Sequence, residues 1–311
     1  MTVPQAIVLE RNKLVLRRIA RVLGCAGFEV RTAEEPDKIE AASLEAASLV
    51  MADAFDADLV MKWLRVHPRL RAALYSGEPV DRLLGKALEE PRLVALIGRP
   101  SFEVPPREDD LLHIARRTLS SESAPFESHL AWGAAGFAYS LTDAKGRDHA
   151  VQETMAFAAK LGAPKRVGEM LGELSHELIM NALYDAPVDE LGKPRFAHDR
   201  KQEISLEAGD AAVYRCGSDG VRIAVEITDH FGRLERKHVF GGLVRALKSG
   251  QMDTTGGGAG LGMLVSYRST TALFYDVEKN LRTRVTGLFD LDLNLREFRL
   301  LPKTIHFPEG T

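Results

Sequence analysis

The sequence predicts two successive folds of different design, a doubly wound and mostly parallel α/β sheet followed by an α+β two-layer sandwich. Three observations predict this division. Short apolar runs alternate with amphipathic helical stretches through the first 118 residues, a Ser-rich polar segment follows residue 119, and the elements beyond it come in a different order. The length of 311 residues also suits two ordinary domains.

The first half contains five apolar runs of strand length with helical patterns between and after them. The runs are Ala6–Leu9, Phe28–Thr32, Ser48–Ala52, Arg71–Tyr75 and Leu93–Ile97. The clearest helical stretches are Lys13–Leu23, Leu59–Val66 and Asp109–Leu119. Because strands that alternate with helices form parallel sheets, we expect residues 1–120 to fold as one doubly wound domain.

After a linker expected at residues 121–129, the pattern begins with helices. One helix is predicted over about His149–Leu161, where Gly162 ends it, and a second from Pro164 to about Asp185. Helices that precede a group of strands favour a helical layer packed on a mainly antiparallel sheet.

The strands of this second domain follow the helices. Val221–Ile227 alternates apolar and polar residues, and the turn at Gly217–Gly220 pairs it with Ala212–Cys216 as a hairpin. A helix is predicted after Gly262, and two further strands over about Ala272–Val277 and Arg284–Leu293. We therefore expect a domain over residues 130–298 and a C-terminal tail over 299–311.

Composition excludes several classes of function. The net charge of −3 gives no field that would attract nucleic acid, and the longest apolar runs contain Glu or Asp, so no membrane insertion is expected. Charged residues run through the first 24 positions, which argues against a secretory signal. Cys25 and Cys216 lie far apart without metal-type spacing and are expected to be reduced thiols, which favours a cytoplasmic location.

A glycine-rich loop is the strongest local signal. It runs straight into an apolar helical stretch, so its backbone N–H groups and the helix N-terminus would form a cradle for an anion. No Gly-Lys-Ser/Thr follows, so it is not a P-loop, and read alone it could equally be a flexible linker. The loop residues that would bind a ligand are Thr255, Gly256, Gly258, Gly260, Leu261 and Gly262.

The predicted helix before Asp185 carries a row of polar residues. Glu173, Glu177, Asn181 and Asp185 recur every four residues, while apolar side chains cover much of the rest of the helix. Magnesium takes hard oxygen ligands and keeps several waters, so the Asn181 amide oxygen beside phosphates would suffice to hold it. Glu177, one turn away, would then orient or deprotonate a nucleophile. The alternative is a solvated polar face.

A third signal is the turn from Asp229 to Gly232 at the end of the strand Val221–Ile227. A carboxylate at a strand end can accept a hydrogen bond from an exocyclic amine. The alternative is an ordinary turn aspartate.

Along the chain these three signals follow one another as helix, turn and glycine loop. Together they resemble the GHKL ATPase superfamily, which includes gyrase, sensor histidine kinases and anti-sigma-factor serine kinases. The resemblance covers about residues 130–295. It implies that Glu177 is the general base and that Asn181 is the magnesium ligand. It also implies that the turn with Asp229 and Gly232 binds adenine and that the glycine loop surrounds the phosphates. A late-strand threonine would support the adenine, and either Thr283 or Thr286 fits. The implied cofactors are ATP and Mg²⁺.

The first half resembles a response-regulator receiver domain over about residues 4–120. Asp53 ends the third strand, where a receiver carries its phosphoacceptor, and Ser76 follows the fourth. Two departures stand out: Glu10-Arg11 replaces the acidic pair that holds magnesium, and Arg99-Pro100 replaces lysine-proline. We therefore expect a degenerate receiver that acts as a docking or dimerising module. Two alternatives stay open for Asp53: it is phosphorylated in spite of these departures, or it is an ordinary aspartate at the end of a strand.

The segment between Leu119 and Ala150 is too short for the helical hairpin that carries the phosphoacceptor histidine in typical histidine kinases. The expected function is therefore that of a magnesium–ATP-binding signalling protein, a kinase that acts in trans on a separate signalling partner. The alternatives are a module whose partner binding is gated by ATP with little turnover, and a scaffold with a vestigial nucleotide site.

Overall fold

The structure is a computed structural model that describes residues 3–120, 122–249 and 259–308. The chain divides into two compact units. One is built from the chain up to Ala124 together with a return segment that starts at Leu300, and the other spans Pro125–Arg299.

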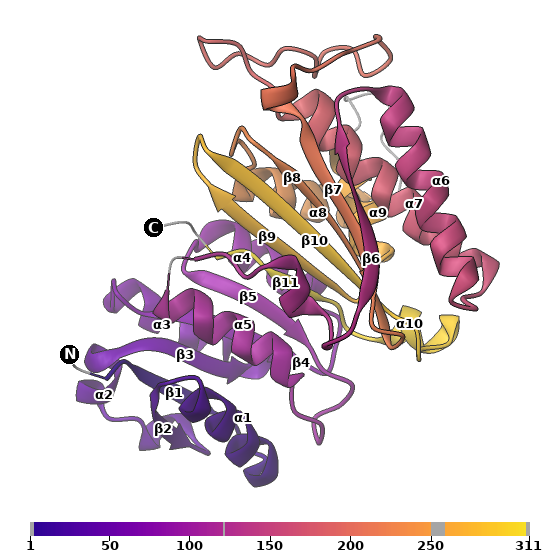
Figure 1. The fold of residues 1–311 in the computed structure, drawn as a ribbon. Helices are drawn as coiled ribbons and strands as arrows, with labels where there is room; N and C mark the ends of the chain where they lie inside the picture. Colours follow the sequence, from indigo (N-terminus) through magenta and orange to yellow (C-terminus); the bar gives the residue numbers. More distant parts are fainter. Residues whose placement is uncertain (1–2, 121, 250–258, 309–311) are drawn as a thin grey trace. The chain divides into compact units, whose positions relative to one another are not determined.

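The first unit contains a sheet with strand order β2-β1-β3-β4-β5-β11 (Figure 1). The first five strands pair in parallel, which is the flavodoxin-like order of a doubly wound fold. This agrees with the expected receiver-like α/β fold. The strands are β1 (Gln5–Leu9), β2 (Glu29–Ala33), β3 (Ala47–Asp53), β4 (Arg71–Ser76), β5 (Leu93–Gly98) and β11 (Thr304–His306).

Helices cover both faces of this sheet. On one face, α1 and α5 pack together over a core that includes Val8, Ile19 and Ile114. On the other, α3 contacts β3 and β4, and α4 contacts β5. The Asn12 side chain caps α1 by accepting hydrogen bonds from two backbone N–H groups of its first turn. The helices are α1 (Lys13–Cys25), α2 (Ala41–Ala46), α3 (Ala57–Val66), α4 (Leu84–Glu89) and α5 (Glu108–Leu119).

The segment expected as a C-terminal tail belongs to this sheet. β11 pairs antiparallel with β5, and Thr304 Oγ1 accepts a hydrogen bond of 3.1 Å from the Gly98 N–H. A Cβ at Gly98 would lie 1.8 Å from the Pro302 carbonyl oxygen, so only glycine allows this close approach. His306 adds a buried contact of 3.2 Å from Nε2 to Asp110 Oδ1. The strand is only three residues long, so it gives no periodic signal in the sequence.

The second unit contains an antiparallel sheet with strand order β9-β10-β8-β7-β6. The predicted hairpin is confirmed as β7 and β8, and the two late strands as β9 and β10. Strand β6, at the edge, was not predicted. The strands are β6 (Ala135–Leu141), β7 (Ala212–Ser218), β8 (Arg222–Asp229), β9 (Ala272–Glu278) and β10 (Arg282–Asp290).

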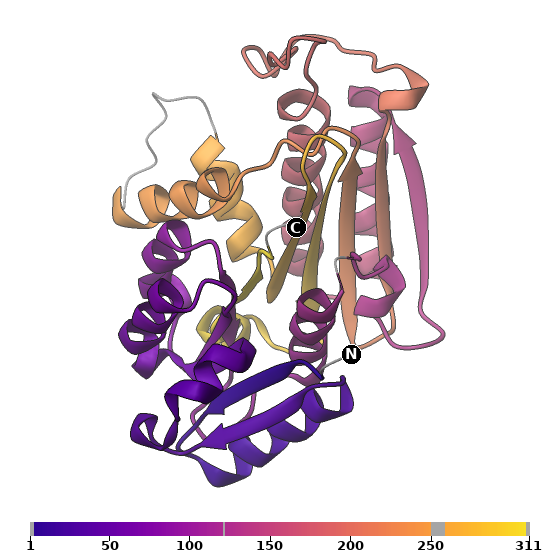
Figure 2. The same cartoon turned by 90° about the vertical axis from the view of Figure 1, so that its left-hand side faces the viewer.

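Helices pack on one face of this sheet, as Figure 2 shows for α6 and α7. The Tyr214 hydroxyl from β7 forms buried hydrogen bonds with Thr154 Oγ1 of α6 at 2.5 Å and Ser175 Oγ of α7 at 2.8 Å. This network fixes both helices on the sheet. The helices are α6 (Ala144–Lys160), α7 (Lys165–Met180), α8 (Arg236–Ser249), α9 (Ala259–Arg268) and α10 (Leu295–Leu300).

Among the boundaries that differ from expectation, two lie near the start of the second unit. Helix α6 begins five residues early, because Asp143 caps it by accepting a hydrogen bond of 2.8 Å from the Gly146 N–H. The second half of the expected linker forms a 3₁₀ turn, Phe126–His129, whose Phe126 packs with Ala224 and Phe274 of the sheet. None of the helices in the described part of the chain combines the length and apolar character that a bilayer crossing demands.

Candidate functional site

The predicted polar row lies at the C-terminal end of α7 in the second unit. After Met180 the helix continues as a π-helical turn, η5 (Asn181–Asp185), closed by a 2.9 Å hydrogen bond from the Ala186 N–H to the Asn181 carbonyl. Such turns are rare and occur often at functional sites. Glu177, Asn181 and Asp185 are all partly buried here, whereas Glu173 is exposed and pairs with Arg166. The row is therefore less buried than expected, and three of its four members converge.

Glu177 faces the helix that follows the glycine loop. A Cβ at Gly262 would lie 2.3 Å from Glu177 Oε2, so the absence of a side chain at 262 makes room for this carboxylate. Gly260, Leu261 and Gly262 form the first turns of α9, which packs on α7. The base candidate and the end of the loop are thus adjacent. Thr255, Gly256 and Gly258 lie outside the described residues.

The turn after β8 is tightly built. Asp229 is buried, and its Oδ1 accepts hydrogen bonds from the N–H groups of Phe231 at 2.8 Å and Gly232 at 3.2 Å. Gly232 has φ of +60°, and a Cβ there would lie 2.1 Å from the Glu278 carbonyl oxygen. Glycine is therefore required by backbone conformation and by space. Burial raises the pKa of Asp229, and the two backbone N–H groups and the Thr283 hydroxyl oppose that shift.

The two threonine candidates lie on opposite faces of β10. Thr283 is paired with Asp229 across the strands, and its buried hydroxyl makes no hydrogen bond of standard geometry within the described chain. Position 287, on the same face as 283, lies against Leu174 of α7, so this face looks toward the helices. Thr286 points the other way and donates to Glu226 Oε2 at 2.9 Å. Only Thr283 lies beside Asp229.

An arginine that the sequence analysis did not single out reaches the polar row. Arg200 lies in the segment after α7 and forms an ion pair with Asp185. Its Nη2 also lies 3.4 Å from the Asn181 Oδ1. Burial raises the pKa of Asp185, and the charges of Arg200 and of His238 from α8 oppose that shift. No local sequence signal identifies Arg200, because it lies 15 residues from its carboxylate partner.

In the first unit, the receiver-like positions meet around a buried arginine. Arg99 donates from Nη1 to Glu10 Oε2 at 2.9 Å and from Nη2 to Asp53 Oδ2 at 2.5 Å. Its guanidinium also lies 4.9 Å from the ring centroid of Tyr75 and 5.0 Å from that of Phe102. The side chains of Arg99 and Glu10 are both 0% exposed. Asp53, the candidate phosphoacceptor, is thus an ion-pair partner of Arg99.

Arg11, the other departure from the receiver pattern, has its own carboxylate partner. Arg11 donates to both carboxylate oxygens of Asp56, at 2.6 and 3.0 Å, and stacks on the exposed ring of Phe55. Ser76, at the switch position, is buried and accepts a hydrogen bond of 2.9 Å from the Glu78 N–H. Two guanidinium groups therefore lie among the carboxylates where a receiver holds a metal ion.

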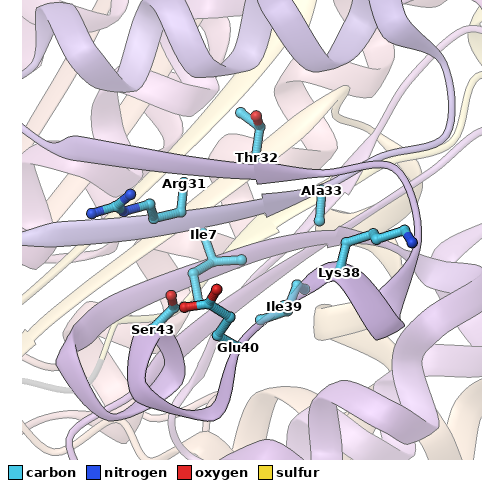
Figure 3. Close-up of a pocket in the computed structure, with 8 residues that line it drawn as sticks. All are labelled: Ile7, Arg31, Thr32, Ala33, Lys38, Ile39, Glu40 and Ser43. Carbon is cyan, nitrogen blue, oxygen red and sulfur yellow. The ribbon is translucent and has the colours of Figure 1, made fainter.

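A cavity of about 210 Å³ also lies in the first unit, away from Asp53 (Figure 3). Its only arginine, Arg31, pairs with Glu29 at 3.0 Å. None of the predicted site residues lines it. The residues around it are Ile7, Arg31, Thr32, Ala33, Lys38, Ile39, Glu40 and Ser43. Across the described ranges, no three His, Cys, Asp or Glu side chains are placed to hold a metal ion together.

Comparisons with known proteins place few limits on this chain. No family model matches the sequence, and no curated protein matches it. Among solved structures, a response regulator from Thermotoga maritima is similar at 20% sequence identity, with 38% of this chain and 98% of that chain covered and a TM-score of 0.31.

Proposed function

We propose that the second unit binds ATP with magnesium in the manner of the GHKL superfamily, and that the protein is a signalling kinase that acts on a separate partner protein. The receiver-like unit serves as its docking or dimerising module. The observation that carries this proposal is the group formed by Asp229, Gly232 and Thr283 on the helix-facing side of the sheet. A buried carboxylate beside a buried hydroxyl that lacks a well-formed hydrogen bond suits the amine and ring nitrogen of adenine.

The phosphate end of the nucleotide would lie toward the polar row. Turn η5 contacts β8, and α7 contacts α9, which supports a nucleotide that extends from the proposed adenine turn past Asn181 and Glu177. The oxygen chemistry at Asn181 fits magnesium, with the remaining ligands supplied by phosphates and water. When bound, magnesium neutralises charge on the phosphates.

Glu177 is the residue to which we assign proton transfer. Glu177 is partly exposed and its carboxylate lies against Gly262 in the first turn of α9, where a hydroxyl brought by a partner would reach it. Accepting the proton of that hydroxyl would make the oxygen a nucleophile toward the γ-phosphorus, whose bond to the β–γ bridging oxygen would break and release ADP. His176, its neighbour, has a lowered pKa because it is half-buried, which favours a neutral imidazole over a cationic one.

Calorimetric titration with a non-hydrolysable ATP analogue and magnesium tests binding. Asn181→Ala should abolish magnesium-dependent binding, while Asn294→Ala, at the start of α10, should leave it unchanged. Equal affinities of the Asn181 variant and the wild type would refute the site.

Labelled ATP, with and without cell extract, tests catalysis. Glu177→Gln should bind the nucleotide normally but lose hydrolysis and transfer, because the amide cannot accept the proton. Retained turnover would remove Glu177 from the reaction. Normal binding without turnover in the wild type under all conditions would instead favour an ATP-gated binding module.

A further inference from the structure

The segment that follows the π-helical turn contains no helix or strand from residue 186 to 207, all of which are described. Several contacts hold it in place, among them a backbone hydrogen bond of 2.9 Å from the Leu206 N–H to the Thr142 carbonyl. The Tyr184 hydroxyl donates to the Gln202 carbonyl at 3.0 Å, Arg195 pairs with Asp210 at 2.9 Å, and Arg200 pairs with Asp185. Arg200 is therefore the point at which this segment meets the proposed magnesium ligand.

Arg200 and a metal ion would compete for the same atom. The guanidinium already lies 3.4 Å from the Asn181 Oδ1, which is the oxygen assigned to magnesium. Two cations that share one oxygen stand only a few ångströms apart, where like charges repel each other strongly. Both cannot occupy the site in the arrangement observed.

The contact is built to be exchanged. The Arg200 side chain is 27% exposed and Asp185 33%, so water can replace each partner at modest cost. The groups that face this pair are His238 from α8, which acts on Asp185, His176 from α7, whose pKa is lowered by burial and also by the nearby Arg200 guanidinium, and Asn181 from turn η5. Among the described residues, no aromatic ring stacks on the Arg200–Asp185 pair. Arg200 lies outside any helix or strand, whereas Asp185 ends turn η5.

We propose that Arg200 is an internal competitor of the magnesium–nucleotide complex: it occupies the metal side of the site when the site is empty and leaves with its segment when the complex binds. This inference rests on the proposed function. The apparent affinity for nucleotide is then the intrinsic affinity reduced by the fraction of molecules in which Arg200 occupies the site. Partners that draw the 186–207 segment away would raise that affinity.

The test compares Arg200→Ala with Lys201→Ala, using a non-hydrolysable ATP analogue and magnesium. Each variant removes one positive charge at neighbouring positions of the same segment. A simple loss of positive charge would weaken binding of an anion in both. Release of a competitor worth about 1 kcal/mol should instead tighten binding about fivefold in Arg200→Ala, with less than about a twofold change in Lys201→Ala.

Each outcome is decisive. Weaker binding by Arg200→Ala would show that the arginine is a phosphate ligand, and unchanged binding would show that it does not compete, so either overturns the inference while leaving the ATP site intact. Binding by Arg200→Ala but not by wild type would support it strongly. If neither protein binds, the proposed function itself fails and the inference with it.

A second measurement follows the segment directly in the wild type. Trypsin cleavage after Arg195 and Lys201, read by mass spectrometry, should become faster when the magnesium–nucleotide complex is added, because the segment is released. Protection on adding nucleotide, or no change under conditions in which calorimetry shows binding, would contradict the displacement of Arg200.

Discussion

The two units each place an arginine against the acidic or amide oxygens where a metal ion is expected, but they hold it in different ways. Arg99 is fully buried, bridges Glu10 and Asp53, and packs between two aromatic rings. Arg200 is partly exposed and comes from a segment without helix or strand.

The difference lies in what surrounds the ion pair. Around Arg99, removing the guanidinium would leave two carboxylates with little access to water, so the cation is part of the fold. Around Arg200, solvent can take over both partners, so the cation can be exchanged. The first unit therefore contains a fixed internal cation, and the second contains one that a ligand could displace.

The largest effect should follow from removing the fixed cation. Arg99→Ala should lower the free energy of unfolding by about 3–5 kcal/mol, because it leaves Glu10 and Asp53 uncompensated. Urea denaturation measures this. Arg31→Ala, which breaks an exposed pair with Glu29, should cost less than about 1 kcal/mol and serves as the control. A loss below 1 kcal/mol for Arg99→Ala would erase the distinction between the two arginines.

A smaller effect is expected at the turn from Asp229 to Gly232 after β8. Gly232→Ala should cost about 3 kcal/mol, because the new Cβ meets backbone atoms of the β9–β10 connection and φ is positive. Gly220→Ala is the matched control: φ is also positive, at +86°, but nothing lies within 4 Å, so only about 1 kcal/mol should be lost. Equal losses in thermal unfolding would mean that the turn is not as tightly packed as the structure has it.

Asp229→Asn should increase stability at pH 7 by about 1 kcal/mol, because burial penalises the carboxylate. Since the folded-state pKa of Asp229 is raised, its ionisation weakens the fold as pH rises through that pKa. The gain should therefore shrink as pH falls toward the ordinary range of an aspartate, in denaturation curves recorded between pH 4 and 8. Asp219→Asn, in the β7–β8 turn, is the control. A gain that does not depend on pH would indicate another cause.

For phosphorylation of the first unit we expect no effect at all. Acetyl phosphate with magnesium should not label the wild-type chain, because Arg99 occupies Asp53 Oδ2 and Arg11 stands beside Asp56. Phosphate-affinity gels measure this, and the variant Arg11→Asp with Arg99→Lys, which restores the receiver pattern, tests whether labelling can be recovered. Stable labelling of wild-type Asp53 would reverse the interpretation of the first unit.

The sequence predicts those parts of the molecule whose residues repeat with a regular period. All five parallel strands of the first unit and the β7–β8 hairpin are confirmed, because alternating or continuous apolar residues mark them. Strand β6 has no such pattern, since as an edge strand most of its residues are exposed. Strand β11 depends on a contact with Gly98 more than 200 residues away.

The same limit applies to the candidate sites. The motifs indicate Glu177, Asn181 and Asp229, and the departures at Arg11 and Arg99 are visible as residue types in the wrong place. The partners of those arginines are not visible in the sequence, because Asp56 and Glu10 come close to them only when the chain is folded. The choice of Thr283 over Thr286 likewise needs the register of β10 on β8.

The most direct test of the account is a calorimetric titration of the full chain with magnesium and a non-hydrolysable ATP analogue, which reports affinity and stoichiometry together. The account predicts one nucleotide per chain, bound only with magnesium, lost in Asn181→Ala and unaffected by Asp53→Asn. Absence of binding by the wild type, or binding that disappears in the Asp53 variant but survives in the Asn181 variant, would contradict it.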